Sequence, residues 1–208
     1  PWRTDIRDAT ELARRRLDSS SLRRDSAFEE SSRKRLLGPN GEGLAAAVFK
    51  LKGQKSRPGP EFQAVLSALQ EVYPRIDNVL TERSHAGRLY LLFKEQGISE
   101  PLGQDNVSDG VLHALALLLS LEGGLGGKGP LAIEEPENAI HPWSLRAMIR
   151  RAQKKDPVRQ LLITTHSETL VNAVEDPANL YVVENAGSHG TTVTRATDRE
   201  SALKSILS

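Results

Sequence analysis

Cysteine is absent from the sequence, and long apolar runs are missing as well. Without cysteine the protein has no disulfide framework, no thiolate zinc site and no cysteine nucleophile. This composition fits a reducing compartment, and we expect a cytoplasmic protein. The longest apolar stretch, 112–121, contains His113 and Ser120 and is far shorter than the roughly 20 residues that a transmembrane helix needs. We therefore expect no membrane span and no membrane partner.

Aromatic residues are scarce, at 4% of the 208 residues, whereas 26% are charged. The charge is uneven, because residues 1–60 carry 14 Lys+Arg and 8 Asp+Glu, a balance of +6, and the remainder balances at −5. A basic group near the start could contact the phosphates of DNA. Its members are Arg14, Arg15, Arg16, Arg23, Arg24, Arg33, Lys34 and Arg35. Since stacking aromatic residues are nearly absent there, a solvated helical face is the favoured interpretation.

Residues 1–60 are predicted to form a basic segment of helices and loops. Apolar residues recur at helical spacing over 4–17. A polar, serine-rich stretch over 19–32 is typical of a mobile loop. A further helical pattern covers 44–51.

Residues 61–208 are predicted to form a unit of the α/β class. A helix over 62–73 leads to two strands, 76–81 and 88–93, joined by a turn. Helices (108–121, 142–153) then alternate with buried strands (131–133, 161–165), and the segments 167–174, 180–183, 191–194 and 201–207 continue the series. Strands without polar alternation, separated by helices, predict a mostly parallel sheet flanked by helices on both faces. Ligands of such sheets bind beyond the carboxyl ends of the strands.

The most informative stretch is an apolar strand that ends in acids, LAIEEPEN, with Glu134, Glu135 and Glu137. Because successive side chains of a strand point to opposite sides, the two adjacent acids serve different purposes. One can hold a hydrated Mg²⁺ ion while the other orients a water for attack on a phosphate. The alternative is an acidic helix N-terminus, where Glu135 and Glu137 favour the helix dipole.

A second motif, VSDG, immediately precedes an apolar helix that starts near residue 111. Ser108 is a good N-cap, and a serine hydroxyl with the free amides of a helix start forms an anion site. Plain capping explains Ser108, Asp109 and Gly110 equally well.

A third motif, LLITTHS, is another apolar strand with a polar end, at His166. Parallel strands present their carboxyl ends at the same edge, so His166 could donate to a phosphate oxygen there. A lone histidine at a strand end is more often structural, and the edge position is what favours function.

These three motifs, in this order, resemble the second half of an ABC-class ATPase head. The stretches VSDGVLHALALLL, IEEPENAIHP and LLITTHSETLV resemble most closely the SMC/RecF-like ATPases, which include the heads of OLD (overcoming-lysogenization-defect) nucleases. The resemblance is strong over 100–185. It implies the C-terminal lobe of a P-loop NTPase head that dimerises around two ATP molecules and serves DNA repair, chromosome handling or phage defence.

The resemblance also assigns roles to residues of this sequence. Ser108, Asp109 and Gly110 match the signature motif, which contacts the γ-phosphate held by the other head. Glu134 supports Mg²⁺, and Glu135 polarises the attacking water. His166 senses the γ-phosphate. The loop from Glu137 through Asn138 to His141 crosses between the heads. The sequence departs from the family at two positions, since Glu134 replaces the usual Asp and His141 replaces the usual acid.

A phosphate-cradling loop of the form GxxxxGK[ST] is not found in the sequence. The stretch GPNGEGLA over 38–45 has the glycines, but Leu44 replaces the lysine and Ala45 the hydroxyl residue. We interpret it as a loop and a helix start. We expect the P-loop in an N-terminal lobe, from the same or a separate chain, and expect this chain alone to be inactive as an ATPase.

Three other functions remain open from the sequence. One is a metal-dependent nuclease or hydrolase that uses the acids of 134–137 with His141 and His166. Another is a dimerisation or binding module without hydrolysis. The last is a transporter ATPase subunit. DNA or a nuclease is a possible partner of the ATPase, which we expect to act as a homodimer of heads.

Overall fold

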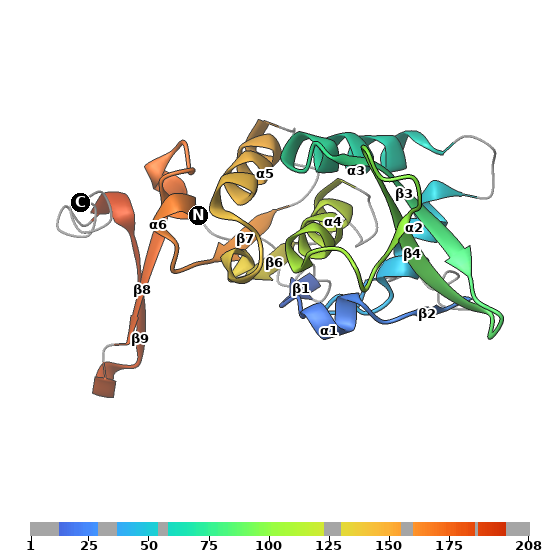
Figure 1. Ribbon diagram of the computed structural model, residues 1–208. Helices are drawn as coiled ribbons and strands as arrows, with labels where there is room; N and C mark the ends of the chain where they lie inside the picture. Colours follow the sequence, from blue (N-terminus) through green and yellow to red (C-terminus); the bar gives the residue numbers. More distant parts are fainter. Residues whose placement is uncertain are drawn as a thin grey trace.

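The computed structural model describes residues 13–28, 37–53, 58–122, 130–154, 160–185 and 187–198. Its central element is a three-stranded parallel sheet in the order β1-β6-β7 (Figure 1). The strands are β1 (Ala13–Arg15), β6 (Leu131–Glu134) and β7 (Leu161–Thr164). Arg14 is in register with Ala132, and Ala132 with Leu162. Thus β6 and β7, which end in the predicted site motifs, are neighbours.

Helices pack beside this sheet, which confirms the prediction of an α/β fold with a parallel sheet and flanking helices. The short α6 (Glu168–Val171) follows β7, α5 (Pro142–Lys154) follows β6, and α4 (Asp109–Glu122) contacts α5, whereas α3 (Pro60–Val72) packs mainly on α4. Figure 1 shows α5 beside β6 and β7, with α4 between α5 and the second sheet. Each of the long helices lies within two residues of its predicted range. Periodicity and the proline at the start of α3 and α5 are strong local signals.

A second sheet, antiparallel, lies beyond α4. Its strand order is β2-β4-β3. Strand β2 pairs with the first residues of β4, and β5 pairs with Leu92 and Phe93 further along β4. The strands are β2 (Ser26–Ala27), β3 (Ile76–Arg83), β4 (Arg88–Glu95) and β5 (Leu102–Gly103). The predicted strand pair is confirmed as β3 and β4, joined by a turn at Gly87 with φ 74°. The parallel arrangement therefore applies to the sheet of β6 and β7, and not to this one.

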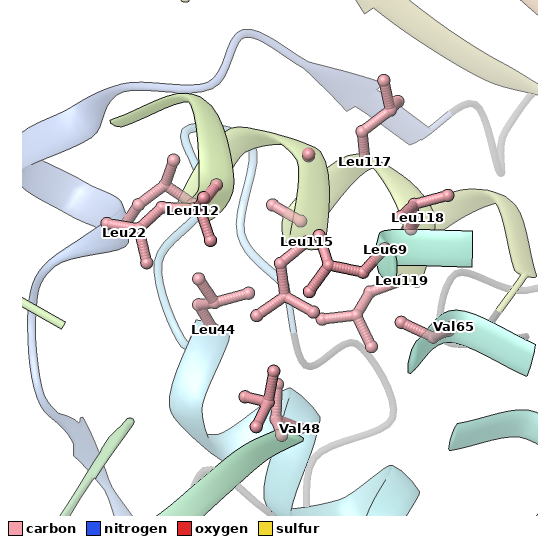
Figure 2. Close-up of a cluster of buried hydrophobic side chains, with 14 of the residues drawn as sticks. Leu22, Leu44, Val48, Val65, Leu69, Leu112, Leu115, Leu117, Leu118 and Leu119 are labelled. Atoms are coloured by element: carbon pink, nitrogen blue, oxygen red, sulfur yellow. The ribbon is translucent and has the colours of Figure 1, made fainter. Parts of the chain in front are cut away.

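The core is built around α4, whose residues 111–120 are all buried. A helix that is apolar on every side must be enclosed on every side. Figure 2 shows its leucines meeting Leu22, Leu44 and Val48 together with Val65 and Leu69 of α3. Leu44 and Val48 come from α2 (Leu44–Lys52). Residues on both sides of position 60 thus share one core.

The N-terminal segment departs from the sequence prediction. The described part of the helix expected over 4–17 is instead a strand, β1, because Ala13–Arg15 pairs with β6. The remainder of that predicted helix lies outside the described residues. Part of the expected mobile loop is also regular, since α1 (Ser19–Leu22) is capped by Asp18 and buries Leu22 completely. Tertiary burial outweighs the polar composition here.

The C-terminal part forms a hairpin of β8 (Tyr181–Asn185) and β9 (Thr191–Arg195), which extends away from the rest of the structure (Figure 1). This hairpin is antiparallel and separate from the parallel sheet. The sequence prediction, in which these strands continue the parallel series, does not anticipate a separate hairpin. The last predicted segment, 201–207, lies outside the described residues. Within the described ranges no helix has the length and apolar character needed to cross a membrane.

Candidate functional site

Glu134 ends β6, and its carboxylate forms an ion pair with Arg14 of the neighbouring strand. Arg14 Nε donates to Glu134 Oε1. This hydrogen bond lowers the pKa of Glu134 below its ordinary value, and the small effect of burial opposes it. The lowered pKa favours the ionised carboxylate of Glu134, and a carboxylate oxygen is the type of group that Mg²⁺ prefers.

Glu135 has a backbone conformation that is unusual for its residue type. Its φ of 43° and ψ of 55° lie in the left-handed region, and it is the one non-glycine residue with positive φ in the described ranges. Such a conformation costs about 1–3 kcal/mol and is found most often at functional sites. Its amide donates to Thr164 O at 2.9 Å, and Asn138 N donates to its carbonyl at 3.1 Å. These bonds hold the turn.

The Glu135 side chain faces a different set of groups from Glu134. Asn138 Nδ2 donates to Glu135 Oε2 at 2.9 Å, and His166 Nε2 lies 3.5 Å from Glu135 Oε1. The two neighbouring carboxylates thus contact separate partners. The cause is the left-handed turn at Glu135, which follows the end of β6, and not the strand alternation expected from the sequence. Glu135 and His166 stand together at the carboxyl ends of β6 and β7.

Glu137 connects the loop after β6 to the loop after β7. Its Oε1 accepts two hydrogen bonds, from Thr165 Oγ1 at 2.7 Å and from His166 N at 2.8 Å. Thr165 Oγ1 in turn accepts from Ser167 N at 2.9 Å. The other oxygen, Oε2, is buried and has no hydrogen-bond partner among the described residues.

The VSDG motif lies at the start of α4, as predicted. The Ser108 carbonyl accepts from Val111 N, while the exposed Ser108 side chain makes no hydrogen bond within the described residues. Arg23 Nη2 binds both Asp109 Oδ1, at 2.5 Å, and the Val107 carbonyl, at 2.9 Å. The hydrogen bond from Arg23 holds the pKa of Asp109 below its usual value. Asp109 is therefore engaged inside the chain, and Ser108 is open to solvent.

Gly110 brings the start of α4 against the loop after β6. A Cβ at this position would lie 2.7 Å from the Tyr73 hydroxyl and 3.2 Å from the Ala139 carbonyl oxygen. Burial raises the pKa of Tyr73, and a hydrogen bond with the buried Ser144 opposes this effect. The glycine is required by close approach, because neither neighbour leaves room for a methyl group.

His141 and Trp143 form the exposed end of the same loop. Trp143 N donates to His141 Nδ1 at 3.3 Å, at the start of α5. The Trp143 side chain is 61% exposed although it is large and apolar. His141 is thus turned to solvent, and it makes no bond to Glu135 or His166 in the described structure.

The loop over 38–43 satisfies its own amides. Asn40 N and Asn40 Nδ2 donate to the carboxylate of Glu42, at 3.0 and 2.8 Å. A Cβ on Gly38 would lie 2.3 Å from Glu42 Oε2, so the carboxylate fills the space inside the loop. Burial raises the pKa of Glu42, but these hydrogen bonds outweigh it and the net pKa is lowered. The Glu42 carboxylate thus lies inside this loop, where a phosphate would lie in a phosphate-binding loop.

The structure brings together Glu135, Glu137, Asn138 and His166, and it places Glu134 beside Arg14. Sequence reasoning missed the partners Arg14, Arg23, Tyr73 and Thr165. Thr165 lies in the LLITTHS motif, so its place near the site could have been predicted from the sequence. Arg14 and Arg23 lie in the basic group near the start, and only the fold determines which acids they contact. Within the described ranges, no three His, Asp or Glu side chains gather in an arrangement for a metal ion. The nuclease alternative gains no support from this geometry.

Comparison with known proteins gives one family match and several distant structural matches. Residues 2–172 match a family model with the description "AAA domain, putative AbiEii toxin, Type IV TA system". No curated protein matches the chain.

Solved structures similar to this chain include SMC head domains. One, with a coiled coil and joint, is from Pyrococcus yayanosii, with 13% identity and a TM-score of 0.47 over 69% of this chain and 28% of that one. A second, from Thermotoga maritima, has 11% identity and a TM-score of 0.46 over 64% and 46%. A third, from Pyrococcus furiosus and bound to the C-terminal domain of ScpA, has 13% identity and a TM-score of 0.44 over 71% and 38%. The chain spans less than half of each of these solved chains.

Proposed function

Because this chain belongs to the family of AAA domains whose model matches residues 2–172, we propose that it supplies the catalytic edge of a dimerising ATPase head. The family is one of ATP-binding ATPases, which confirms the ATPase resemblance read from the sequence. The observation that carries the proposal is the pairing of Glu135 with His166 at 3.5 Å, at the ends of adjacent parallel strands. This edge is where ligands bind in such sheets.

In this proposal Glu135 orients the water that attacks the γ-phosphate of ATP. Its left-handed backbone and the bond from Asn138 fix the carboxylate before substrate arrives, which is the preorganisation that hydrolysis requires. His166, on the next strand, donates to the γ-phosphate oxygens. Positioning and charge stabilisation of this kind account for most of phosphoryl-transfer catalysis.

The residues present fit a role for Mg²⁺ as cofactor. Glu134 would hold the ion, because it offers an ionised carboxylate at the carboxyl end of β6. When bound, Mg²⁺ neutralises the charge on the β- and γ-phosphates. In the described structure Arg14 Nε donates to Glu134 Oε1, so the ion would share this carboxylate with Arg14 or replace it.

The phosphate cradle is proposed to come from a separate P-loop lobe. Inside the loop over 38–43 the Glu42 carboxylate accepts hydrogen bonds from the backbone and side-chain amides of Asn40, which supports the proposal that this loop does not hold a phosphate. The face of the parallel sheet that carries Arg14 and Glu134 also carries Leu162, which is 57% exposed. An exposed leucine on the face of a parallel sheet is typical of a face that another element covers. A P-loop lobe packed there would meet Glu134.

Dimerisation is proposed to proceed through the start of α4. Ser108 is exposed and its side chain makes no hydrogen bond in the described structure, so it is available to a nucleotide held by a second head. Gly110 holds this helix start against the loop that contains Asn138 and His141. The resemblance to RecF-like and OLD-type heads supports a role in DNA repair or phage defence, with DNA or a nuclease as partner.

Calorimetry with Mg-ATP tests whether the cradle is missing. We expect the 208-residue chain to bind Mg-ATP weakly or not at all, because exposed carboxylates repel a triphosphate without a lysine to neutralise it. Micromolar binding, about −8 kcal/mol, would contradict the proposal. Gly43→Val is the matched variant. It would abolish binding by a true cradle at the start of α2 and leave unchanged any binding located elsewhere. Because Gly43 has a φ of 81°, circular dichroism must first show that the variant is folded.

A further inference from the structure

Glu137 is the side chain that joins the two catalytic loops. It lies on the short 3₁₀ turn Pro136–Asn138 after β6, and its carboxylate reaches the segment that follows β7. There it accepts from the Thr165 hydroxyl at 2.7 Å and from the His166 amide at 2.8 Å. Both bonds converge on one oxygen, Oε1. The backbone at His166 is thereby tied to the loop that carries Glu135.

The position of the His166 ring depends on this tie. The His166 side chain is 90% exposed, and within the described residues its one polar contact is Glu135 Oε1, at 3.5 Å. A ring so exposed is not held by packing. Its location relative to Glu135 is therefore set by where the backbone of the loop is held, and Glu137 accepts the hydrogen bond from that backbone.

We propose that Glu137 is a positioning residue that holds His166 at a fixed distance from Glu135. This inference rests on the proposed ATPase function for its effect on turnover, but not for its effect on the loop itself. Glu137 acts through the backbone of residues 165 and 166, and its carboxylate need not touch nucleotide. The role differs from the place in a loop between heads that the resemblance implies for Glu137.

Amide hydrogen exchange in the 208-residue chain tests the tie without nucleotide. In Glu137→Ala the His166 amide loses its acceptor, and we expect its exchange to accelerate about tenfold or more, as for loss of a hydrogen bond to a carboxylate. Glu137→Gln keeps a carbonyl oxygen at the accepting position and should restore protection. Glu137 Oε2 has no hydrogen-bond partner among the described residues, so replacing it with the NH₂ group of the Gln side chain breaks no hydrogen bond.

Two further variants complete the hydrogen-exchange experiment. Glu168→Ala is the matched control, because Glu168 is an exposed glutamate two residues after His166 with no side-chain bond in the described structure, and exchange at His166 should not change. Thr165→Val removes one of the two donors, and should give a smaller acceleration. Unchanged exchange at His166 in Glu137→Ala would overturn the inference, and so would equal acceleration in Glu137→Ala and Glu168→Ala.

Turnover in a P-loop-containing protein tests the coupling. We expect Glu137→Ala to lower kcat while the KM for ATP stays within about twofold, because the lost geometry concerns the transition state. Glu137→Gln should recover most of kcat. In a His166→Ala background the Glu137→Ala change should have no further effect on kcat, since a positioning residue acts through the group that it positions.

The outcomes separate this inference from the proposed function. An equal loss of kcat from Glu137→Ala with and without His166 would overturn the positioning role. Failure of Glu137→Gln to restore kcat would do the same, because it would assign the effect to charge. If His166→Ala itself leaves kcat unchanged, the proposed role of His166 fails, and hydrogen exchange alone decides whether Glu137 holds the loop.

Discussion

Gly110→Ala is expected to destabilise the fold by forcing a methyl group into the contact between α4 and its neighbours. The new Cβ would lie 2.7 Å from the Tyr73 hydroxyl and 3.2 Å from the Ala139 carbonyl. Neither atom is the free end of a flexible chain. The Tyr73 hydroxyl is bonded to buried Ser144, and the Ala139 carbonyl is backbone. Some part of this region must therefore shift.

The expected size follows from two opposing effects. Overpacking of this kind costs about 1–3 kcal/mol. Alanine is favoured over glycine in a helix by up to about 1 kcal/mol, and Gly110 lies in the first turn of α4. If about half of that helix preference applies in the first turn, the net loss in the free energy of unfolding should be about 0.5–2.5 kcal/mol. At an m-value of about 2 kcal/mol/M this lowers the urea midpoint by about 0.25–1.25 M.

Urea unfolding of four proteins tests this reasoning: the parent chain, Gly110→Ala, Tyr73→Phe and the double variant. Tyr73→Phe deletes the oxygen at 2.7 Å, so Gly110→Ala should cost less in that background than in the parent. The comparison within each background removes the separate cost of losing the bond to Ser144. An equal cost in both backgrounds, or no cost in the parent, would refute the steric explanation of the glycine.

Three further predictions follow from the same geometry. Arg14→Ala should raise the pKa of Glu134 measured by NMR titration, because the hydrogen bond that lowers it is lost, and an unchanged midpoint would contradict the ion pair. Asp109 has a folded pKa below its ordinary value of 3.8, so its pair with Arg23 stabilises the fold above that pH and the contribution is lost as the pH falls below it. Asp109→Asn should therefore flatten the acid side of a plot of unfolding midpoint against pH, and an unaltered plot would count against the pair. Ser108→Arg should block ATP-driven dimerisation of a P-loop-containing protein, measured by sedimentation, and leave nucleotide affinity of the single head nearly unchanged. A collapse of that affinity would place Ser108 in a site within one head.

The elements near the site could be predicted well from the sequence, since their signals are local. Helix α4 follows the VSDG motif at the expected place, although the Ser108 side chain makes no capping hydrogen bond in the described structure. Strands β6 and β7 are short apolar runs with polar ends. Two strands separated by a helix pair in parallel, which places Glu135 and His166 at one edge. The proximity of Glu135 and His166 can therefore be predicted from the order of strands and helices along the sequence.

The N-terminal part could not be predicted in the same way. The apolar residues over 4–17 recur at helical spacing, but Ala13–Arg15 forms a strand because the edge of β6 offers unpaired backbone groups. The serine-rich stretch becomes ordered because Leu22 enters the core around α4. Arg14 and Arg23 consequently meet Glu134 and Asp109 over long sequence separations, which composition and periodicity do not encode.

Turnover of ATP by a P-loop-containing protein with Glu135→Gln is the most direct test of the proposed function. The amide keeps the shape of the side chain but cannot act as a base. The account predicts a loss of about 10²–10⁴ in kcat, with ATP binding and head dimerisation preserved. Turnover close to that of the parent protein would contradict the assignment of Glu135 and, with it, the catalytic edge at β6 and β7.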